Sequence, residues 1–256
     1  MSLVLDKYDI MEEEQSLKYF SFAFGLSQFF GGLSVILMAV WMGTYGGFGW
    51  TDDPEHQFHY HPLFMAIGMV FLYGEAILVY RVFRHERKRF TKLLHGILHA
   101  MIFVFVVVAL KAVFDSHNLH KDDLGNAKPL ENMYTLHSWL GMATVVMFCL
   151  QFVCGFVCFF FPGLSLPVRQ WYLPLHQVFG ILIFALAIIT ALMGISERAA
   201  WHVGCWKKLC SEGVVVNLVG LSILFYGLLV IFLVGNPRYR RRSLPEEESL
   251  HQLTAD

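Results

Sequence analysis

Histidine is the residue type with the clearest capacity for chemistry in this sequence of 256 residues, which contains twelve of them. Five lie at or inside the ends of long apolar segments: His61, His95, His99, His137 and His176. Ionisable side chains are costly within a membrane-spanning segment and tend to mark function there. Five others lie in polar loops or in the C-terminal tail, where we expect ordinary solvated side chains: His56, His59, His85, His202 and His251.

Pairs of histidines on facing helices favour one kind of metal site over another. Zinc usually takes four protein ligands, or three and a water molecule, and acids or thiolates are often among them. No acid or cysteine accompanies these histidines at a suitable spacing. Haem iron takes two axial ligands, and a helix bundle is a common place to supply them. Because two axial histidines leave no open position on the iron, such a site favours electron transfer over oxygen chemistry.

Six apolar segments must position these histidines. Each is long enough to cross a hydrocarbon core of roughly 30 Å, which takes about 20 residues as a helix. Backbone polar groups in lipid must be paired within the segment, which favours helices. The composition agrees, because 56% of the residues are hydrophobic and only 15% are charged. We predict an all-α integral membrane protein whose six transmembrane helices are near Tyr19–Thr44, His61–Phe83, Lys92–Phe114, Leu136–Phe161, Pro174–Ile195 and Gly213–Val234.

The distribution of cations predicts the orientation of these helices. Most of the 19 Lys and Arg residues lie in the N-terminal tail, the second and fourth loops and the C-terminal tail. The positive-inside rule assigns these segments to the cytoplasm. We therefore expect a cytoplasmic tail at 1–18, a transmembrane domain at 19–235 and a second cytoplasmic tail at 236–256. The net charge of -1 gives no reason to expect a nucleic-acid partner.

This orientation sorts the histidines by depth. Helices two and four run inward from the outer face, and His61 and His137 open them. Helices three and five run the other way, so His99 and His176 lie towards the cytoplasm. The four form two pairs, one on each side of the membrane. His95 lies four residues before His99 on the same helical face, about 6 Å nearer the cytoplasm. Periodicity alone leaves open which of these two is a ligand.

The five cysteines form no zinc or iron–sulfur pattern. Cys149, Cys154 and Cys158 lie in the fourth helix, where we expect packing roles. Cys205 and Cys210 lie in the fifth loop, outside the cytoplasm in this topology. An oxidising compartment permits a disulfide between them, although their spacing alone does not establish the geometry.

Five stretches, in this order, carry a family resemblance: "HPLFMAIGMVFLYGEAILVYRVFR", "TKLLHGILHA", "MYTLHSWLG", "FPGLSLPVRQWYLPLHQVFG" and "SEGVVVNLVG". The sequence resembles the cytochrome b561 family of transmembrane ascorbate-dependent oxidoreductases, over about residues 20 to 236. The basic loop "VYRVFRHERKRFTKLLHGILH" and the "FPG" before the fifth helix look most like the chromaffin-granule, or secretory-vesicle, type.

The resemblance implies a four-helix core, made by helices two to five, around two b-type haems. By motif position, His61 and His137 ligate the iron of the non-cytoplasmic haem. His99 and His176 ligate the iron of the cytoplasmic haem. This leaves His95 as a residue that lines the cytoplasmic substrate site.

The resemblance also implies two substrate sites. Ascorbate is an anion at pH 7, and the cytoplasmic site that binds it is expected at Arg81, Lys92, His95 and Arg169. Arg offers a planar fork and Lys a point charge to such an anion. The acceptor site on the other side is expected at His117, Asn118 and Glu212.

Members of this family pass single electrons from cytosolic ascorbate to an acceptor outside the cytosol. The vesicle type implies monodehydroascorbate as acceptor, and ferric-reducing relatives imply a ferric chelate. The resemblance further implies a homodimer in a secretory-vesicle or other endomembrane.

Two other functions are weighed against this one. The HxxxH spacing of His95 and His99, with "HQFHYH", is reminiscent of membrane di-iron desaturases and hydroxylases. Those enzymes gather their histidines on one side of the membrane, whereas these are divided between two sides, and no HxxHH box is present. A transporter that uses histidines as proton relays would leave their pairing unexplained.

Overall fold

The structure, a computed structural model, describes residues 2–50, 53–161 and 163–241, with side chains at Gln15 and from Leu17 onward. The tail expected at 236–256 therefore lies mostly outside the described residues, as do Arg242 and His251. The tail expected at 1–18 continues the first helix, α1, as helical backbone.

The described residues contain six helical segments long and apolar enough to span a membrane, so the predicted all-α, six-span fold is confirmed. One span is built from several consecutive helices, and short 3-10 turns flank the last. The bounds are α1 Ser2–Tyr45, α2 Pro54–Phe58, α3 Tyr60–Met65, the π-helix η1 Ala66–Leu72, α4 Tyr73–Val82, α5 Lys88–Asn118, α6 Leu136–Phe159, α7 Leu166–His202, η2 Trp206–Lys208, α8 Ser211–Gly235 and η3 Pro237–Tyr239.

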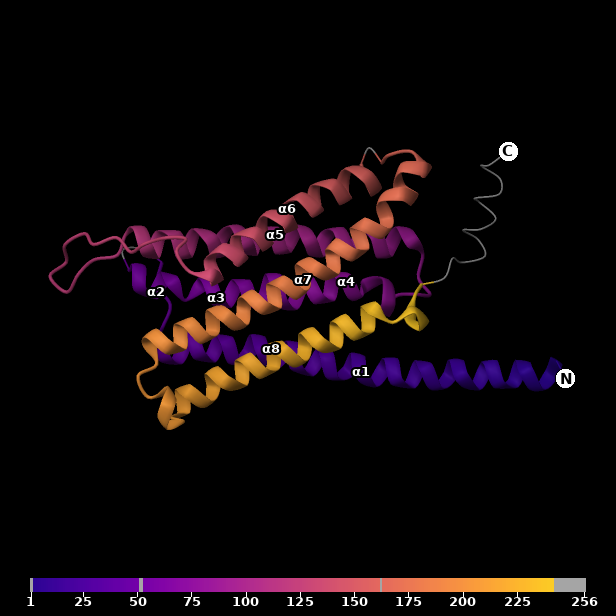
Figure 1. The fold of residues 1–256 in the computed structure, drawn as a ribbon, viewed down its shortest axis with the longest axis horizontal. Helices are drawn as coiled ribbons and strands as arrows, with labels where there is room; N and C mark the ends of the chain where they lie inside the picture. The colour runs from indigo at the N-terminus through magenta and orange to yellow at the C-terminus, as the bar shows by residue number, and fades with distance from the viewer. Residues whose placement is uncertain (1, 51–52, 162, 242–256) are drawn as a thin grey trace.

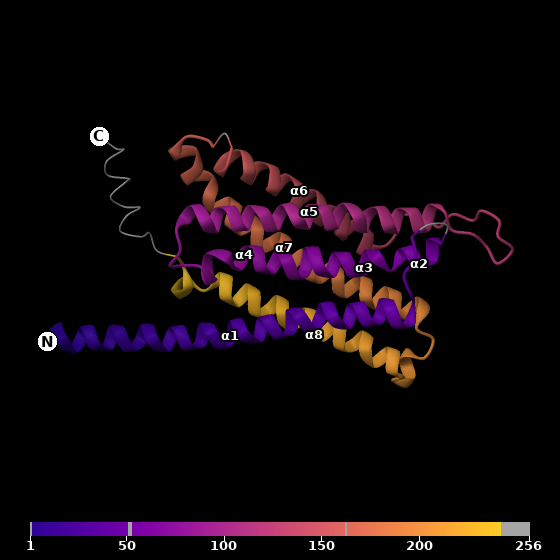
Figure 2. The ribbon, with the colours of Figure 1, turned by 180° about the vertical axis from the view of Figure 1, so that it is seen from behind.

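The helices divide into a core and a flanking pair. Figures 1 and 2 show α1 and α8 side by side, while α3–α4, α5, α6 and α7 form the rest of the bundle. The N-terminal part of α1 extends beyond the bundle (Figure 1). The end of the bundle that carries α2 and the start of α3 is called the His61 end below. The opposite end, where α5 and α7 begin, is called the His176 end.

A buried polar network joins the flanking pair to the core. Glu75 of α4 accepts hydrogen bonds from Gln28 Nε2 of α1 (2.8 Å) and from the Tyr226 hydroxyl of α8 (3.0 Å). Gly74 makes room for the Tyr226 ring, because a Cβ there would collide with the hydroxyl. Since a buried carboxylate is costly without partners, these bonds fix α1 and α8 against α4.

The start of α7 differs from the sequence prediction, and the loop that follows α7 contains a disulfide. The fifth span was expected to begin at Pro174, but α7 begins at Leu166 and continues through Pro174. Proline lacks an N–H and usually kinks or ends a helix, but α7 remains helical on both sides of Pro174. Beyond α7, Cys205 and Cys210 form a disulfide, as their position permitted.

Candidate functional site

His61 of α3 and His137 of α6 face each other at the His61 end. Their ring centres are 6.3 Å apart. His61 Nδ1 donates to the Ala109 carbonyl of α5 (3.2 Å), and His137 Nδ1 donates to the Thr190 carbonyl of α7 (2.9 Å). A carbonyl only accepts, so each ring keeps its proton on Nδ1 and leaves the Nε2 lone pair free. This is the arrangement in which metal-ligating histidines are usually held.

A capping box fixes His137 in place. The Thr135 side chain accepts from the Ser138 backbone N–H, and the Ser138 hydroxyl accepts from the Thr135 N–H, which begins α6 here. Two otherwise unpaired helix-end N–H groups are thereby satisfied. Because His137 lies between the two capping residues, its backbone direction follows from this local sequence.

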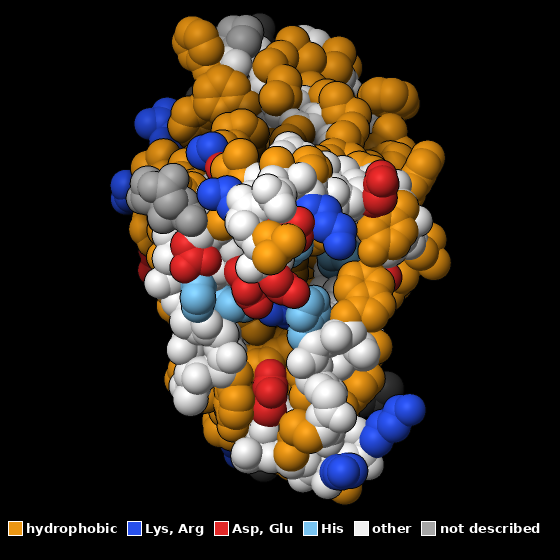
Figure 3. All heavy atoms as spheres, turned by 90° about the vertical axis from the view of Figure 1, so that its left-hand side faces the viewer, with side chains coloured by type: hydrophobic (Ala, Val, Ile, Leu, Met, Phe, Trp, Pro, Cys, Tyr) orange, Lys and Arg blue, Asp and Glu red, His pale blue; other side chains and the backbone are white. Residues whose placement is uncertain are grey.

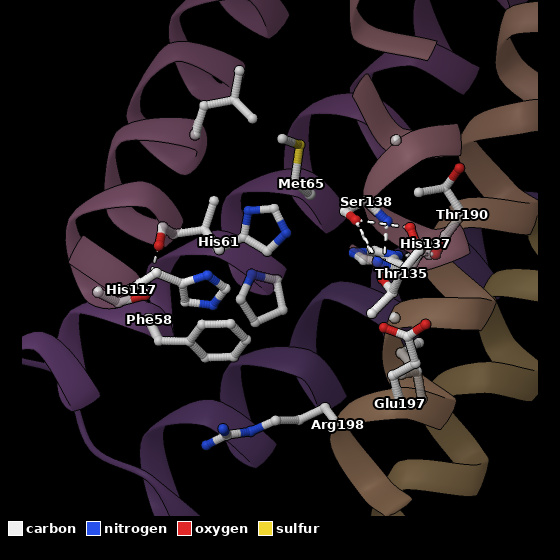
Figure 4. A pocket seen from close by; sticks show the side chains of 18 of the residues that line it. Phe58, His61, Met65, His117, Thr135, His137, Ser138, Thr190, Glu197 and Arg198 are labelled. Carbon is white, nitrogen blue, oxygen red and sulfur yellow. Dashed lines mark hydrogen bonds between the residues drawn. The ribbon is translucent and has the colours of Figure 1, made fainter. Parts of the chain in front are cut away.

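The two imidazoles line a cavity of about 590 Å³ that opens at the His61 end. Ligand-binding pockets are typically about 300–1,000 Å³. Figure 4 shows His61, His117 and His137 around it, with Phe58 and Arg198 nearer its mouth. Gly194 lies against His137, and a Cβ at Gly194 would come within 2.9 Å of His137 Nδ1. The absence of a side chain at Gly194 is therefore needed for the His137 ring to occupy this position.

Three histidines, His95, His99 and His176, cluster at the other level of the bundle. The ring centres of His95 and His176 are 6.2 Å apart, nearly the separation of the first pair. His95 Nδ1 donates to the Ala76 carbonyl (2.7 Å), which again leaves Nε2 free. His99 is packed against His95 (4.5 Å between ring centres), and its Nδ1 is buried without a partner among the described residues. The geometry thus pairs His176 with His95.

The positions of these histidines along the axes of α5 and α7 lead to the same pairing. The helices α5 and α7 run in the same direction, and the carbonyls of Ala109 and Thr190 mark the level of the first pair on them. His95 precedes Ala109 by fourteen residues on α5, and His176 precedes Thr190 by fourteen residues on α7. Fourteen residues correspond to about 21 Å along each helix. His99 lies four residues deeper. A partner for His176 at equal depth is therefore His95.

The expected ascorbate residues divide between two places at the His176 end. Lys92 Nζ donates to the Phe159 carbonyl (3.0 Å), and the Phe159 ring packs on His176 (5.3 Å). Arg169 is close enough for its charge to act on Lys92, and its Nε is buried without a partner among the described residues. Arg81 instead donates through Nη2 to the Val234 carbonyl of α8. The structure thus groups Lys92 and Arg169, with Arg81 turned towards α8.

The expected acceptor residues are only partly brought together. His117 lines the cavity, and its Nδ1 donates to Asn132 Oδ1 (3.0 Å). Asn118 accepts from Asn132 Nδ2 (2.8 Å) and so supports that contact. Glu212 is not among the residues that line the cavity, and its carboxylate accepts from the Trp41 indole (3.1 Å). It is separated because α8 packs on α1 at the side of the bundle.

His59 and Arg198 were missed by the sequence interpretation. His59 was expected to be solvated, which is wrong, since it is 3% exposed and hydrogen-bonded to the Gly47 carbonyl (2.7 Å). His202, also expected to be solvated, is exposed and lines the cavity together with Arg198. A histidine in a polar loop gives no signal of burial, and here the burial arises because the Gly46–Gly47 turn packs on the ring.

The family of eukaryotic cytochromes b561 matches residues 60–202, a range that includes all five histidines of the two levels. This chain belongs to the cytochrome b561 family. Among its relatives, a putative transmembrane ascorbate-dependent reductase (CYB561 homolog) of Caenorhabditis elegans is 52% identical, covering 100% of this chain and 98% of the relative. The human transmembrane ascorbate-dependent reductase CYB561 is 41% identical, covering 88% and 86%. A plasma membrane ascorbate-dependent reductase, CYBRD1 of Xenopus tropicalis, is 38% identical, covering 87% and 76%.

Cytochromes b561 contain haem, and the residues present fit this cofactor. An imidazole nitrogen lies about 2 Å from a first-row metal ion, so two nitrogens on opposite sides of one ion are about 4 Å apart. The ring centres then lie one ring radius further back on each side, in agreement with 6.3 Å and 6.2 Å. No group of three or more His, Cys, Asp or Glu among the described residues could hold a metal ion by itself.

Proposed function

We propose that this cytochrome b561 is a transmembrane ascorbate-dependent reductase with two bis-histidine b haems. It takes single electrons from cytosolic ascorbate and delivers them to monodehydroascorbate on the other side, so that ascorbate is regenerated there. The observation that supports this most strongly is the recurrence of one histidine-pair geometry at two levels of a membrane-spanning bundle. When bound, haem supplies reversible one-electron chemistry at each level.

His61 and His137 are proposed to hold the haem at the non-cytoplasmic face, as expected. For the cytoplasmic haem the contacts support His95 with His176 and not the expected pair of His99 with His176. The ring separation and the axial level favour His95. Its Nδ1 is also bonded to a carbonyl, whereas the Nδ1 atoms of both His99 and His176 have no partner among the described residues. His99 then lies between the two levels, where it packs on Tyr73 (5.1 Å) and Phe148 (5.9 Å). This proposal exchanges the roles expected of His95 and His99.

Gly194 offers a test of the outer pair that leaves every polar group in place. Gly194→Ala puts a methyl group where His137 lies, so we expect the outer haem to be lost while the other is retained. Haem extraction from the purified protein measures the stoichiometry. Gly220→Ala is the matched control, because its new Cβ meets only the Leu192 side chain at 3.9 Å. Full haem content in Gly194→Ala would contradict the assignment of His137.

Lys92 and Arg169 are proposed to bind ascorbate at the cytoplasmic face. Both carry positive charge beside His176, and each is partly buried, which strengthens attraction for an anion relative to water. Arg81 adds to the charge at this end, and its Nη1 is buried without a partner in the described part of the chain. The ascorbate monoanion gives up one electron and one proton here and leaves as the radical anion.

Neutralising these cations should weaken ascorbate binding. A hydrogen bond to a charged group contributes about 1.5–3 kcal/mol, so Lys92→Gln or Arg169→Gln should raise the ascorbate concentration for half-maximal reduction rate by about tenfold or more. Stopped-flow absorption of the haem bands measures it. Arg89→Gln, at an exposed cation in the first turn of α5, is the control. An unchanged concentration dependence would remove the residue from the site.

The residues of the non-cytoplasmic cavity favour an acceptor that takes up an electron and a proton together. The monodehydroascorbate radical anion becomes the ascorbate monoanion by gaining one of each. His117 Nδ1 donates to Asn132 Oδ1, which leaves the Nε2 lone pair of this cavity-lining residue free.

A ferric chelate is the second candidate acceptor, and the acidic residues at the cavity mouth favour it. Glu55, Glu131 and Glu197 line the cavity, and acidic and histidine side chains gather at the centre of this face (Figure 3). These three carboxylates are well suited to attract iron, but the described residues hold no three-ligand metal group. We therefore propose monodehydroascorbate as the acceptor ahead of a ferric chelate. We further expect both termini to lie in the cytoplasm, the protein to reside in an endomembrane and two chains to form a homodimer.

A reduced-minus-oxidised absorption spectrum of the purified protein, with ascorbate as reductant, tests this function. We expect strong b-type bands and two haems per chain. A protein that contains no haem, or whose haem is not reduced by ascorbate, would overturn the proposal.

A further inference from the structure

Arg198 of α7 is a cation at the mouth of the outer cavity that the proposed chemistry has not used. It is half-buried, and it is the single Lys or Arg among the described residues that line this cavity. The cations at the other end of the bundle are proposed to bind ascorbate, whereas Arg198 lies on the acceptor side, close to Phe58 and His61. Its surroundings indicate what it binds.

Two contacts hold the guanidinium group in one place. Arg198 Nη2 donates to His59 Nε2 (3.1 Å), and His59 Nδ1 donates to the Gly47 carbonyl (2.7 Å). Arginine only donates, so Nε2 of His59 must accept, which agrees with a proton on Nδ1. A Cβ at Gly46 would collide with the His59 ring, so the ring is also wedged sterically. The guanidinium is therefore pre-positioned before any ligand arrives.

Phe58 connects this cation to the first histidine pair. The Arg198 guanidinium lies 4.7 Å from the centre of the Phe58 ring, and that ring packs on His61 at 6.1 Å. In Figure 4, Phe58 lies between Arg198 and the imidazoles of His61 and His117. A molecule held by Arg198 would thus lie beside the edge of the outer electron-transfer centre.

No protein carboxylate neutralises Arg198 within ion-pair distance in the part of the chain that the structure describes. Glu197 precedes it on α7, but its side chain extends towards Thr135 and His137 (Figure 4). A half-buried cation without a paired anion is unfavourable, and its planar fork suits two oxygens of one oxyanion. The charges of Glu55 and Glu212 act on Arg198 from beyond ion-pair distance, so the guanidinium remains able to bind the two oxygens of an oxyanion.

We propose that Arg198 binds an oxyanion of the electron acceptor and selects an anionic acceptor for this site. The inference rests on the proposed function, which supplies monodehydroascorbate as an anion with adjacent oxygens. Arg198 would hold that anion while it gains one proton and one electron, which a haem held by His61 and His137 would supply, and the ascorbate monoanion would then be released. The residue forms and breaks no covalent bond. The carboxylates of the haem itself present the same chemistry, and the experiment separates the two sources.

The test compares Arg198→Gln and Arg198→Lys with the wild-type holoprotein in proteoliposomes that contain ascorbate. Enzymatically generated monodehydroascorbate is supplied on the His61 side and its decay is followed by electron paramagnetic resonance. We expect the KM for the radical to rise about tenfold in Arg198→Gln, with little change in kcat. Arg198→Lys should show a smaller rise, since it keeps the charge but not the fork. Lys208→Gln, an exposed cation at the same end, should leave the KM unchanged.

Three outcomes would overturn the proposal. An unchanged KM in Arg198→Gln removes Arg198 from acceptor binding. A shifted potential or lost haem with an unchanged KM assigns Arg198 to the haem carboxylates instead. For the wild type, the KM for the radical should rise with salt, because salt screens its attraction to Arg198. The absence of this rise would contradict the proposal even if the variants do not accumulate. A wild-type protein that never reduces the radical would instead refute the proposed function.

Discussion

His95→Ala is expected to lose the haem at the His176 end, whereas His99→Ala is expected to keep both haems. In this account His95 shares a level with His176 and is held through Nδ1 by the Ala76 carbonyl, while His99 lies about 6 Å deeper. Removing an axial ligand removes half of the iron's protein bonds, so the effect should be near-complete loss. Haem extraction and the reduced spectrum of each purified variant measure it.

The same pair of variants contains its own control. His99→Ala also removes a buried imidazole from the same helix face, so it reproduces the packing defect without touching the proposed ligand. If His99→Ala lost the cytoplasmic haem and His95→Ala retained it, the originally expected ligand set would be correct. The expected secondary effect of His99→Ala is lower stability, because a cavity opens between Tyr73 and Phe148.

His137→Ala is expected to abolish electron delivery across the membrane while ascorbate still reduces the remaining haem. His137 donates to Thr190 at one end of the bundle and has no contact with the histidines about 21 Å away. Rapid-mixing absorption should therefore show reduction of about half the wild-type haem amplitude at a similar ascorbate concentration. Equal loss of both haems would argue against two separate pairs.

Several features of this site could be predicted because they depend on residues that are close together in the sequence. The "YTLHSWLG" stretch contains Thr135 and Ser138 in capping-box positions, so the start of α6 and the depth of His137 follow from neighbouring residues. The six spans follow from length and apolar composition in the same way. The basic residues near His176 followed from the family motifs, and the structure groups Lys92 and Arg169 there.

Other parts of the site depend on how distant helices are aligned. His95 and His99 share one helix face, so the choice between them needs the axial offset of α5 against α7, which spacing along one helix does not contain. Glu212 was expected near His117, but the packing of α8 on α1 turns it towards Trp41. The burial of His59 depends on a glycine turn that follows α1 and on Arg198 from α7.

The central claim is that single electrons cross the membrane from ascorbate on one side to an acceptor on the other. Its most direct test uses proteoliposomes that contain ascorbate, with monodehydroascorbate generated outside. We expect the wild-type protein to accelerate decay of the external radical and to consume internal ascorbate. We expect His137→Ala to do neither, although its remaining haem stays reduced. Radical decay at the same rate in wild-type, His137→Ala and protein-free vesicles would contradict the account.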